Sequence, residues 1–155
     1  MQKSSIKRSR TKRTLSNFSS ELLTIKSPES GPDELLIPFK MPGLNDYVKA
    51  ERGNRYGANH IKQSNQRDIE LFIHNAVIKG TLHRHEKPCR LDLHWVEGNA
   101  RRDLDNVAFA TKFIQDALVV SGIFPDDSQK YIKELHHTLE VQKGIYMVTV
   151  KIEEI

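Results

Sequence analysis

Residues 89–95 alternate strictly between apolar and polar side chains, and no other feature of this chain constrains its fold as much. In an extended backbone successive side chains point to opposite faces, so such alternation predicts a strand with one buried and one exposed face. The predicted buried face holds Cys89, Leu91, Leu93 and Trp95, and the exposed face holds Arg90, Asp92 and His94. A half-buried strand needs other elements to cover its apolar side.

Two amphipathic stripes predict helices that provide this cover. From about Ala58 to Lys79 apolar residues recur at spacings of three and four, and Gly80 follows as a stop signal. A second stripe begins after the polar residues 97–106 and ends near Gly122, which stands where a C-cap glycine would. We therefore expect a long helix and a second helix packed on the sheet.

Three further strands complete the predicted order. Residues 35–39 form a short apolar run in which Pro38 favours an edge position, because proline lacks the N–H that a central strand needs. Residues 131–142 and 145–153 alternate around Lys143 and Gly144, which predicts an antiparallel hairpin. The stretch between the strand over 35–39 and the long helix, residues 40–62, predicts a loop that can contain a short helical turn and overlaps the start of the helix. The order strand, helix, strand, helix, strand, strand predicts an α/β or α+β domain with a small mixed sheet of about four strands.

The basic residues are concentrated at the N-terminus. The whole chain of 155 residues carries a formal net charge of +4, and six positive charges within the first 14 residues leave the remainder at −2. Residues 1–33 are also rich in Ser, and they end in a Pro/Gly/Ser cluster. We predict a flexible basic extension over residues 1–33 and a single domain over residues 34–155.

Three interpretations of this extension stay open. A basic tail is attracted to polyanions, and nucleic acid is the first candidate. The same composition is also typical of a solvated chain end. An organelle leader is disfavoured because the segment lacks a convincing apolar face.

Cysteine content and hydropathy predict a cytoplasmic protein with no membrane partner. Cys89 is the only cysteine, so an internal disulfide is excluded and a reducing compartment is expected. The longest uncharged apolar run is far shorter than the roughly 20 residues of a membrane span. The start of the chain shows no apolar signal-peptide segment either.

A pair of carboxylates precedes the second predicted helix. Asp103 and Asp105 lie two residues apart, so in extended backbone they would point to the same side, about 6.5–7 Å apart. Two such carboxylates can converge on a hard cation such as Mg²⁺ or Mn²⁺. The alternative is that one of them only caps the helix.

Two further charged groups could join this pair. The loop after the helix contains Asp126 and Asp127, and a loop that returns along the helix would bring one of them back to the same end of the sheet. Lys112 follows Asp105 by seven residues, nearly two helical turns, so both would share one helix face. A lysine there could stabilise a leaving oxygen. An ordinary turn and a solvated lysine are the alternatives.

A set of basic residues predicts contacts with DNA phosphates. Most protein–DNA hydrogen bonds go to the backbone, and basic side chains interleaved with Asn and Tyr suit such contacts. The alternative is a polar, solvated helix start. The predicted contact residues are Arg52, Arg55, Lys62 and Arg67, together with Arg101 and Arg102.

The histidine-rich segment 83–89 does not predict a metal site. His83 and His85 are separated by one residue, and Cys89 is a single cysteine, whereas zinc ligands usually come in wider His pairs or Cys pairs. Solvated turn and strand histidines are the expected interpretation.

The acidic motifs resemble those of the RusA-type Holliday-junction resolvases, endonucleases common in phages and prophages. The resemblance rests on RRDLDNVAFATKFIQDAL followed by FPDDSQKYI, and on IPFKMPGLNDYVKAERGNRYGANHIK, which is similar to Gram-positive phage members. It covers about residues 35–155. By resemblance, Asp103 and Asp105 match the paired metal-binding aspartates, and Asp127 matches the third. The family's catalytic lysine follows the second aspartate by one helical turn, where this chain has Phe109, and Lys112 is the nearest lysine.

The resemblance implies a magnesium-dependent, structure-selective DNA endonuclease that resolves four-way junctions in recombination and repair. It also implies Mg²⁺ as the cofactor, with Mn²⁺ as a possible substitute. The protein would be a phage or prophage product in the cytoplasm of a bacterial host cell. A four-way junction has two-fold symmetry, so paired cuts predict a homodimer. The rivals are a non-catalytic nucleic-acid-binding protein that keeps the fold, and an interaction module in which the basic extension is the working part.

Overall fold

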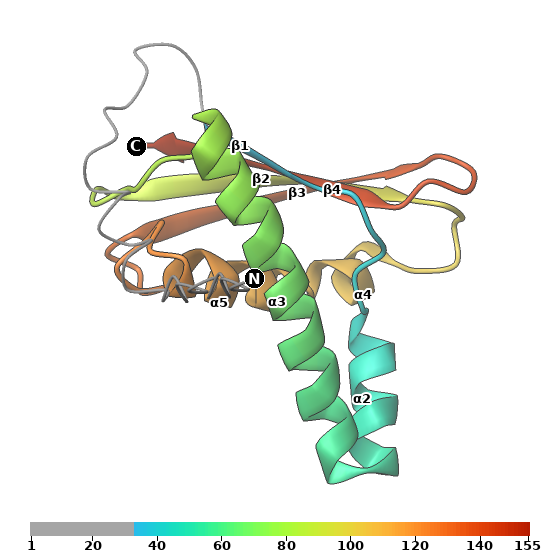
Figure 1. Cartoon of the computed structure of the whole chain (residues 1–155). Coiled ribbons are helices and arrows are strands. Elements are labelled where there is room, and N and C mark those ends of the chain that lie inside the picture. The colour runs from blue at the N-terminus through green and yellow to red at the C-terminus, as the bar shows by residue number, and fades with distance from the viewer. Residues whose placement is uncertain (1–32) are drawn as a thin grey trace, which may run out of the picture.

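A computed structural model describes residues 33–155 of the chain, so the predicted extension lies outside the described residues except for Asp33. Four strands and four helices follow one another in these residues (Figure 1). They are β1 (Asp33–Ile37), α2 (Leu44–Gly53), α3 (Arg55–Lys79), β2 (Cys89–Glu97), α4 (Leu104–Ala108), α5 (Thr111–Val120), β3 (Ile132–Val141) and β4 (Met147–Glu154). The fold is therefore of mixed α and β type, as predicted. Asp33, assigned to the extension, is the first residue of β1.

The four strands form one mixed sheet in the order β1-β4-β2-β3. β4 pairs antiparallel with both β1 and β2, whereas β2 and β3 are parallel. The prediction of an antiparallel hairpin between the last two strands is therefore wrong, because β2 lies between them. The connection crosses the end of β2 instead, where Gln142 N–H donates to the Glu97 carbonyl over 2.9 Å and Gly144 N–H to the Gly98 carbonyl over 3.2 Å.

Burial explains this order better than sequence proximity does. The apolar residues of β2 are almost completely buried, and from Trp95 to its end the strand is buried on both faces. β3 exposes most of its residues after Ile132. A strand with so much apolar surface gains most from a central position, and the exposed strand tolerates an edge. β1 takes the other edge, as Pro38 predicted.

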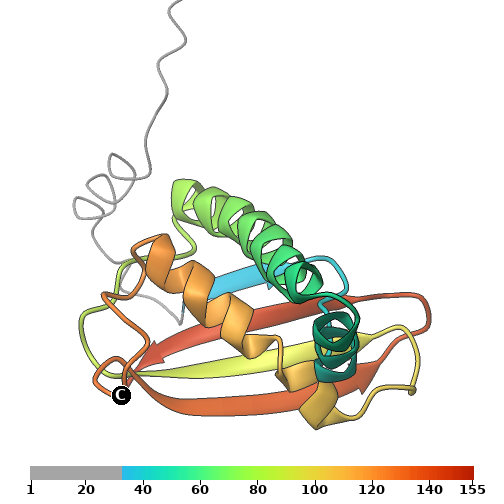
Figure 2. The ribbon, with the colours of Figure 1, turned by 90° about the horizontal axis from the view of Figure 1, so that it is seen from below.

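Helices α3 and α5 cover one face of the sheet and leave the other open (Figure 2). The core lies between them and the sheet, where the apolar residues of β2 and β4 meet the inner stripes of both helices. Trp95, Ile73 and Ile114 are among its fully buried members. The long helix ends as predicted, because Gly80 adopts a left-handed conformation with φ of 74°.

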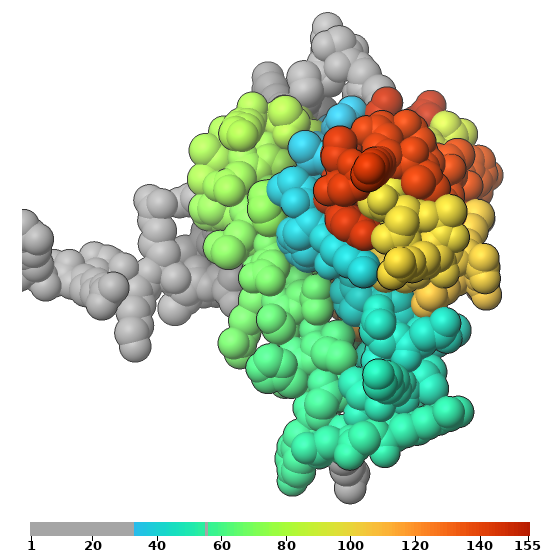
Figure 3. Space-filling model, turned by 90° about the vertical axis from the view of Figure 1, so that its right-hand side faces the viewer, coloured from blue at the N-terminus to red at the C-terminus, as the bar shows by residue number. Residues whose placement is uncertain are grey.

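α2 and the part of α3 that runs beside it form an arm that projects away from the sheet (Figures 1 and 3). The sequence predicted a loop here, and the structure corrects this to a ten-residue helix. None of the residues of α2 is buried, and its apolar stripe is limited to Leu44, Tyr47 and Val48, which is too short for the sequence pattern to indicate a helix. Neither α3 nor any other helix within residues 33–155 is long and apolar enough to cross a membrane.

The helix predicted after the acidic pair is split in two. α4 ends at Ala108 and α5 begins at Thr111, and the turn between them is held by tighter bonds from Ala110 N–H to Val107 and from Phe113 N–H to Ala110. Such bonds across three residues wind the backbone more tightly than an α-helix does. The prediction that Asp105 and Lys112 share one face of a continuous helix is therefore wrong, because Asp105 lies in α4 and Lys112 in α5.

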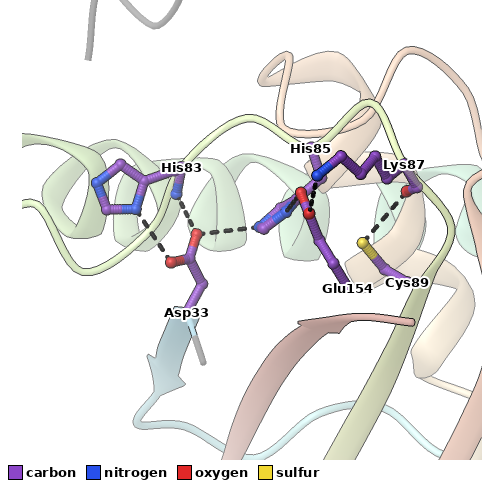
Figure 4. Close-up of polar contacts among 6 residues, drawn as sticks. All are labelled: Asp33, His83, His85, Lys87, Cys89 and Glu154. Carbon is purple, nitrogen blue, oxygen red and sulfur yellow. Dashed lines mark hydrogen bonds and ion pairs between the residues drawn. The ribbon is translucent and has the colours of Figure 1, made fainter. Parts of the chain in front are cut away.

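A buried ionic network joins the start of β1 to the loop before β2 and to the end of β4 (Figure 4). The Asp33 carboxylate contacts the His83 ring over 3.0 Å and the His85 ring over 3.1 Å, and His85 also contacts Glu154 over 3.2 Å. The two histidine residues are only 4% and 8% exposed. The expectation that they are solvated is therefore wrong, because the carboxylates pair with them inside the protein.

Candidate functional site

The predicted aspartate pair lies at the start of α4, where the chain leaves the end of β2. Asp103 occupies the N-cap position with extended backbone, but its side chain makes no capping hydrogen bond. Asp105 follows in the first turn, and both residues are exposed. None of the hydrogen bonds or ion pairs found among residues 33–155 involves either carboxylate. Capping therefore does not occupy the Asp103 carboxylate, and both groups face solvent.

Lys112 and Asp127 form a direct ion pair. The Lys112 ammonium lies 2.6 Å from Asp127 Oδ2 and 2.8 Å from Asp116 Oδ1, so one cation joins α5 to the loop that follows it. The neighbouring Asp126 has a different role, because its carboxylate accepts a hydrogen bond from the Ser128 N–H over 2.8 Å. The loop thus does return along the helix, and it brings Asp127 to Lys112.

These pairings stabilise the charged forms of the groups involved. The pKa of Lys112 is raised, first by the hydrogen bond to Asp116 and then by the one to Asp127. The pKa of Asp127 is lowered, mainly by Lys112. Both side chains are about half exposed, so water screens the attraction, and the pair contributes little to stability.

The donor chemistry of the three predicted ligands fits a hard divalent cation. Carboxylate oxygens are the usual protein ligands of Mg²⁺, and two of the three are unpaired while the third already binds an ammonium as a stand-in cation. Their arrangement is open. Within residues 33–155 no three His, Cys, Asp or Glu side chains converge as a ready-made metal site. The conformation described here therefore keeps the predicted ligands apart.

Hydrogen bonds from the two residues that flank the acidic pair, Arg102 and Asn106, hold the base of the arm. Arg102 donates to both carboxylate oxygens of Glu97, over 2.6 and 2.8 Å, and to the Met41 carbonyl over 2.9 Å. Asn106, which follows the acidic pair, accepts a hydrogen bond from the Asn45 N–H at the start of α2 over 3.1 Å. The segment that carries the predicted ligands thus also holds the arm.

The other predicted DNA-contact residues lie in two regions. Arg101 is exposed next to the acidic pair, whereas the side chain of Arg102 is only 11% exposed and is engaged within the protein. Arg52 lies in the last turn of α2, and Arg55 begins α3. Further along α3, Lys62 contacts Asp116 over 3.2 Å, and Arg67 lines a shallow surface hollow with His60, Gln63, Ser64 and Asp68.

Asp116 is the charged residue of this region that sequence reasoning missed. It lies one helical turn after Lys112, and that spacing alone predicts an ion pair on a helix surface. Its second contact, with Lys62 of α3, depends on how the two helices pack. No pattern in the sequence indicates that contact.

No protein-family model matches this chain, and no curated protein matches it in sequence.

Proposed function

We propose that this protein is a magnesium-dependent, structure-selective DNA endonuclease that cuts four-way junctions. The observation that best supports this proposal is the ion pair between Lys112 and Asp127. These residues are 15 positions apart. By resemblance, Asp127 matches the third aspartate of the resolvases, and Lys112 is the lysine nearest to the position of their catalytic lysine. Their contact unites the helix motif and the loop motif in one place.

The proposed division of labour follows from the chemistry of the side chains. Asp103, Asp105 and Asp127 would hold the metal, which when bound supplies an activated water and neutralises charge on the phosphate. Lys112 would donate a proton or a hydrogen bond to the leaving 3′-oxygen. Arg101 and the exposed basic residues of the arm would contact phosphates on the two sides of the cut.

Symmetry extends the proposal to a homodimer. A four-way junction presents two equivalent strands for cleavage, and a two-fold dimer places one catalytic centre at each. The arm would then hold the junction branches at a fixed distance from each centre.

A second candidate function is a non-catalytic nucleic-acid-binding protein with the same fold. One observation favours it, namely that six positive charges lie within residues 1–14, apart from the proposed catalytic residues, and would attract nucleic acid without any catalytic centre. The two candidates differ in whether phosphodiester bonds are broken.

Cleavage of a synthetic four-way junction distinguishes them. We expect symmetric cuts with Mg²⁺ and none with a chelator. Asp103→Asn or Asp105→Asn should abolish cleavage while junction binding persists, because asparagine keeps the size but loses the charge that a hard cation needs. Asp126→Asn is the matched control, since its amide oxygen can still accept from Ser128, and it should cut normally. Cleavage by Asp103→Asn at the wild-type rate would contradict the proposal.

A further inference from the structure

Four side chains of alternating charge form a continuous line across the helical face of the molecule. Lys62 of α3 contacts Asp116 over 3.2 Å, Asp116 contacts Lys112 over 2.8 Å, and Lys112 contacts Asp127 over 2.6 Å. We call these four residues the charge chain. It begins on α3, continues along α5 and ends in the loop that carries Asp127, a predicted metal ligand.

Asp116 is the fixed member of the charge chain. Its side chain is 19% exposed, against 42% for Lys62 and 53% for Lys112. Each of its two oxygens contacts a different lysine, so the carboxylate is held from both sides. The more exposed lysine side chains are freer to exchange partners, because an exposed ion pair contributes only a small free energy.

The Lys112 ammonium lies where a cation would approach Asp127. It is 2.6 Å from Oδ2, a position that a metal ligand must leave open. A divalent ion that binds Oδ2 must therefore displace the ammonium, and one that binds Oδ1 of the same carboxylate is repelled by it. The displaced ammonium still has a partner, because Asp116 Oδ1 is already within 2.8 Å.

We propose that Asp116 is a positioning residue that retains Lys112 beside the catalytic centre when a divalent cation takes its place on Asp127. Lys112 acts as a built-in competitor of that cation, and Asp116 weakens the competition by providing the ammonium with a second carboxylate. This inference rests on the proposed function, in which Asp127 is a metal ligand and Lys112 serves the leaving oxygen. It adds a residue that neither the motifs nor the resemblance indicated.

A purely structural role for Asp116 makes different predictions. An ion pair between residues four apart on a helix supports the helix by a small amount, and its removal would lower thermal stability without changing cation affinity. The affinity for Mg²⁺ in the absence of DNA is therefore the measurement that separates the two roles.

The test is calorimetric titration of the full chain with MgCl₂ alone, with Asp127→Asn to identify the heat that depends on Asp127. Lys112→Gln should tighten this binding by about two- to fivefold, the range expected for removing one exposed ion pair. Asp116→Asn should weaken it by a similar factor. Lys112→Arg keeps the competing charge and should stay near wild type. Asp68→Asn removes a carboxylate of α3 outside the charge chain and should change nothing.

The double variant Lys112→Gln/Asp116→Asn decides whether Asp116 acts through the lysine. If it does, the double variant binds Mg²⁺ as tightly as Lys112→Gln alone. If Asp116→Asn weakens binding equally in both backgrounds, its charge acts directly on the cation and the inference is overturned. Absence of any Mg²⁺ heat that depends on Asp127 would also overturn it. If the Mg²⁺ affinities of all variants are as expected but the protein does not cleave a four-way junction, the proposed function is refuted and the role of Asp116 stands.

Discussion

At the scale of single residues, the buried network around His85 shows how pairing can keep a histidine charged inside a protein. Burial is the largest single influence on the pKa of His85 and would lower it, but the hydrogen bond to Asp33 and the contacts with Cys89 and Glu154 together outweigh burial. The pKa is raised to about 10. At neutral pH the ring therefore carries a positive charge between two carboxylates.

This pairing predicts a pH-dependent contribution to stability. The folded-state pKa of His85 lies above the ordinary value of 6.5, so its contribution is complete below about pH 6.5 and is lost as the pH rises toward 10. His85→Gln should lower the free energy of unfolding by about 3–5 kcal/mol at pH 6.5, the cost of breaking a buried pair. Urea unfolding of both proteins at pH 6.5, 8 and 10 measures how this difference shrinks.

His94 provides the control for this prediction. Its ring contacts Glu140 over 3.2 Å, but its side chain is 45% exposed, so the pair is screened by water. His94→Gln should change stability by less than about 1 kcal/mol at each pH. A His85→Gln effect that stays constant from pH 6.5 to 10 would show that the ring is neutral in the folded protein.

At the scale of elements, the junction between the arm and α4 depends on one small residue. Gly43 precedes α2, and its N–H donates a hydrogen bond to the Asp46 carboxylate over 2.9 Å. A side chain at Gly43 would collide with residues at and just before α4. A Cβ at Gly43 would lie 2.5 Å from Asn106 Oδ1 and 3.2 Å from Arg102 Nη1. Both of these groups already hold the arm in place, so neither is free to move aside.

Gly43→Ala should therefore loosen the arm. We expect a decrease of about 1–3 kcal/mol in the free energy of unfolding, as for overpacking at a close contact. Gly53→Ala is the matched control, because a Cβ at Gly53 has no atom within 4 Å, and it should be neutral or slightly stabilising. Thermal unfolding measures both. Equal stability of the two variants would show that Asn106 moves aside at little cost.

The sequence predicted helices and strands where apolar residues recur at a regular spacing along one buried face. It failed where the structure depends on contacts between residues far apart in the sequence. The alternation in β2 and the apolar stripe of α3 gave nearly correct bounds, since both elements bury one face. α2 buries none of its residues and was missed. The pairing of β2 with both β3 and β4 depends on competition between strands for the central position, which local alternation does not encode.

The candidate site divides in the same way. The apolar stripe after the acidic pair placed Asp103 and Asp105 at the start of a helix, as the structure has them, whereas the extended backbone expected for the pair ends at Asp103 because Asp105 lies in α4. A loop that returns along the helix was expected, but its direct ion pair between Asp127 and Lys112 was not, and Lys62 reaches Asp116 only because two helices pack together. The structural role of Arg102 was also missed, because its partners Glu97 and Met41 lie on other elements.

At the scale of the whole molecule, the positive charge that would attract DNA lies in a different part of the chain from the proposed catalytic residues. Six positive charges lie within residues 1–14, while residues 15–155 carry a net charge of −2. The residues proposed for metal binding all lie in the second of these parts. The N-terminal segment lies outside the described residues. A compact domain of slightly negative net charge repels DNA at long range, and a basic tail would offset that repulsion.

Removal of residues 1–14 should therefore weaken DNA binding without impairing the chemistry. The logarithm of the DNA-binding constant falls linearly with the logarithm of the salt concentration, with a slope of about −0.9 for each phosphate that the protein neutralises. Removing all six charges would therefore make this slope shallower by up to about 5. Filter binding to a four-way junction at several salt concentrations measures this slope. A full-length variant with Gln at the same six positions should behave as the truncation does, since charge rather than chain length sets the effect. Cleavage at saturating protein should persist in both. An unchanged slope would show that the basic residues at the N-terminus do not contact DNA, and the basic residues of the domain would then account for the affinity.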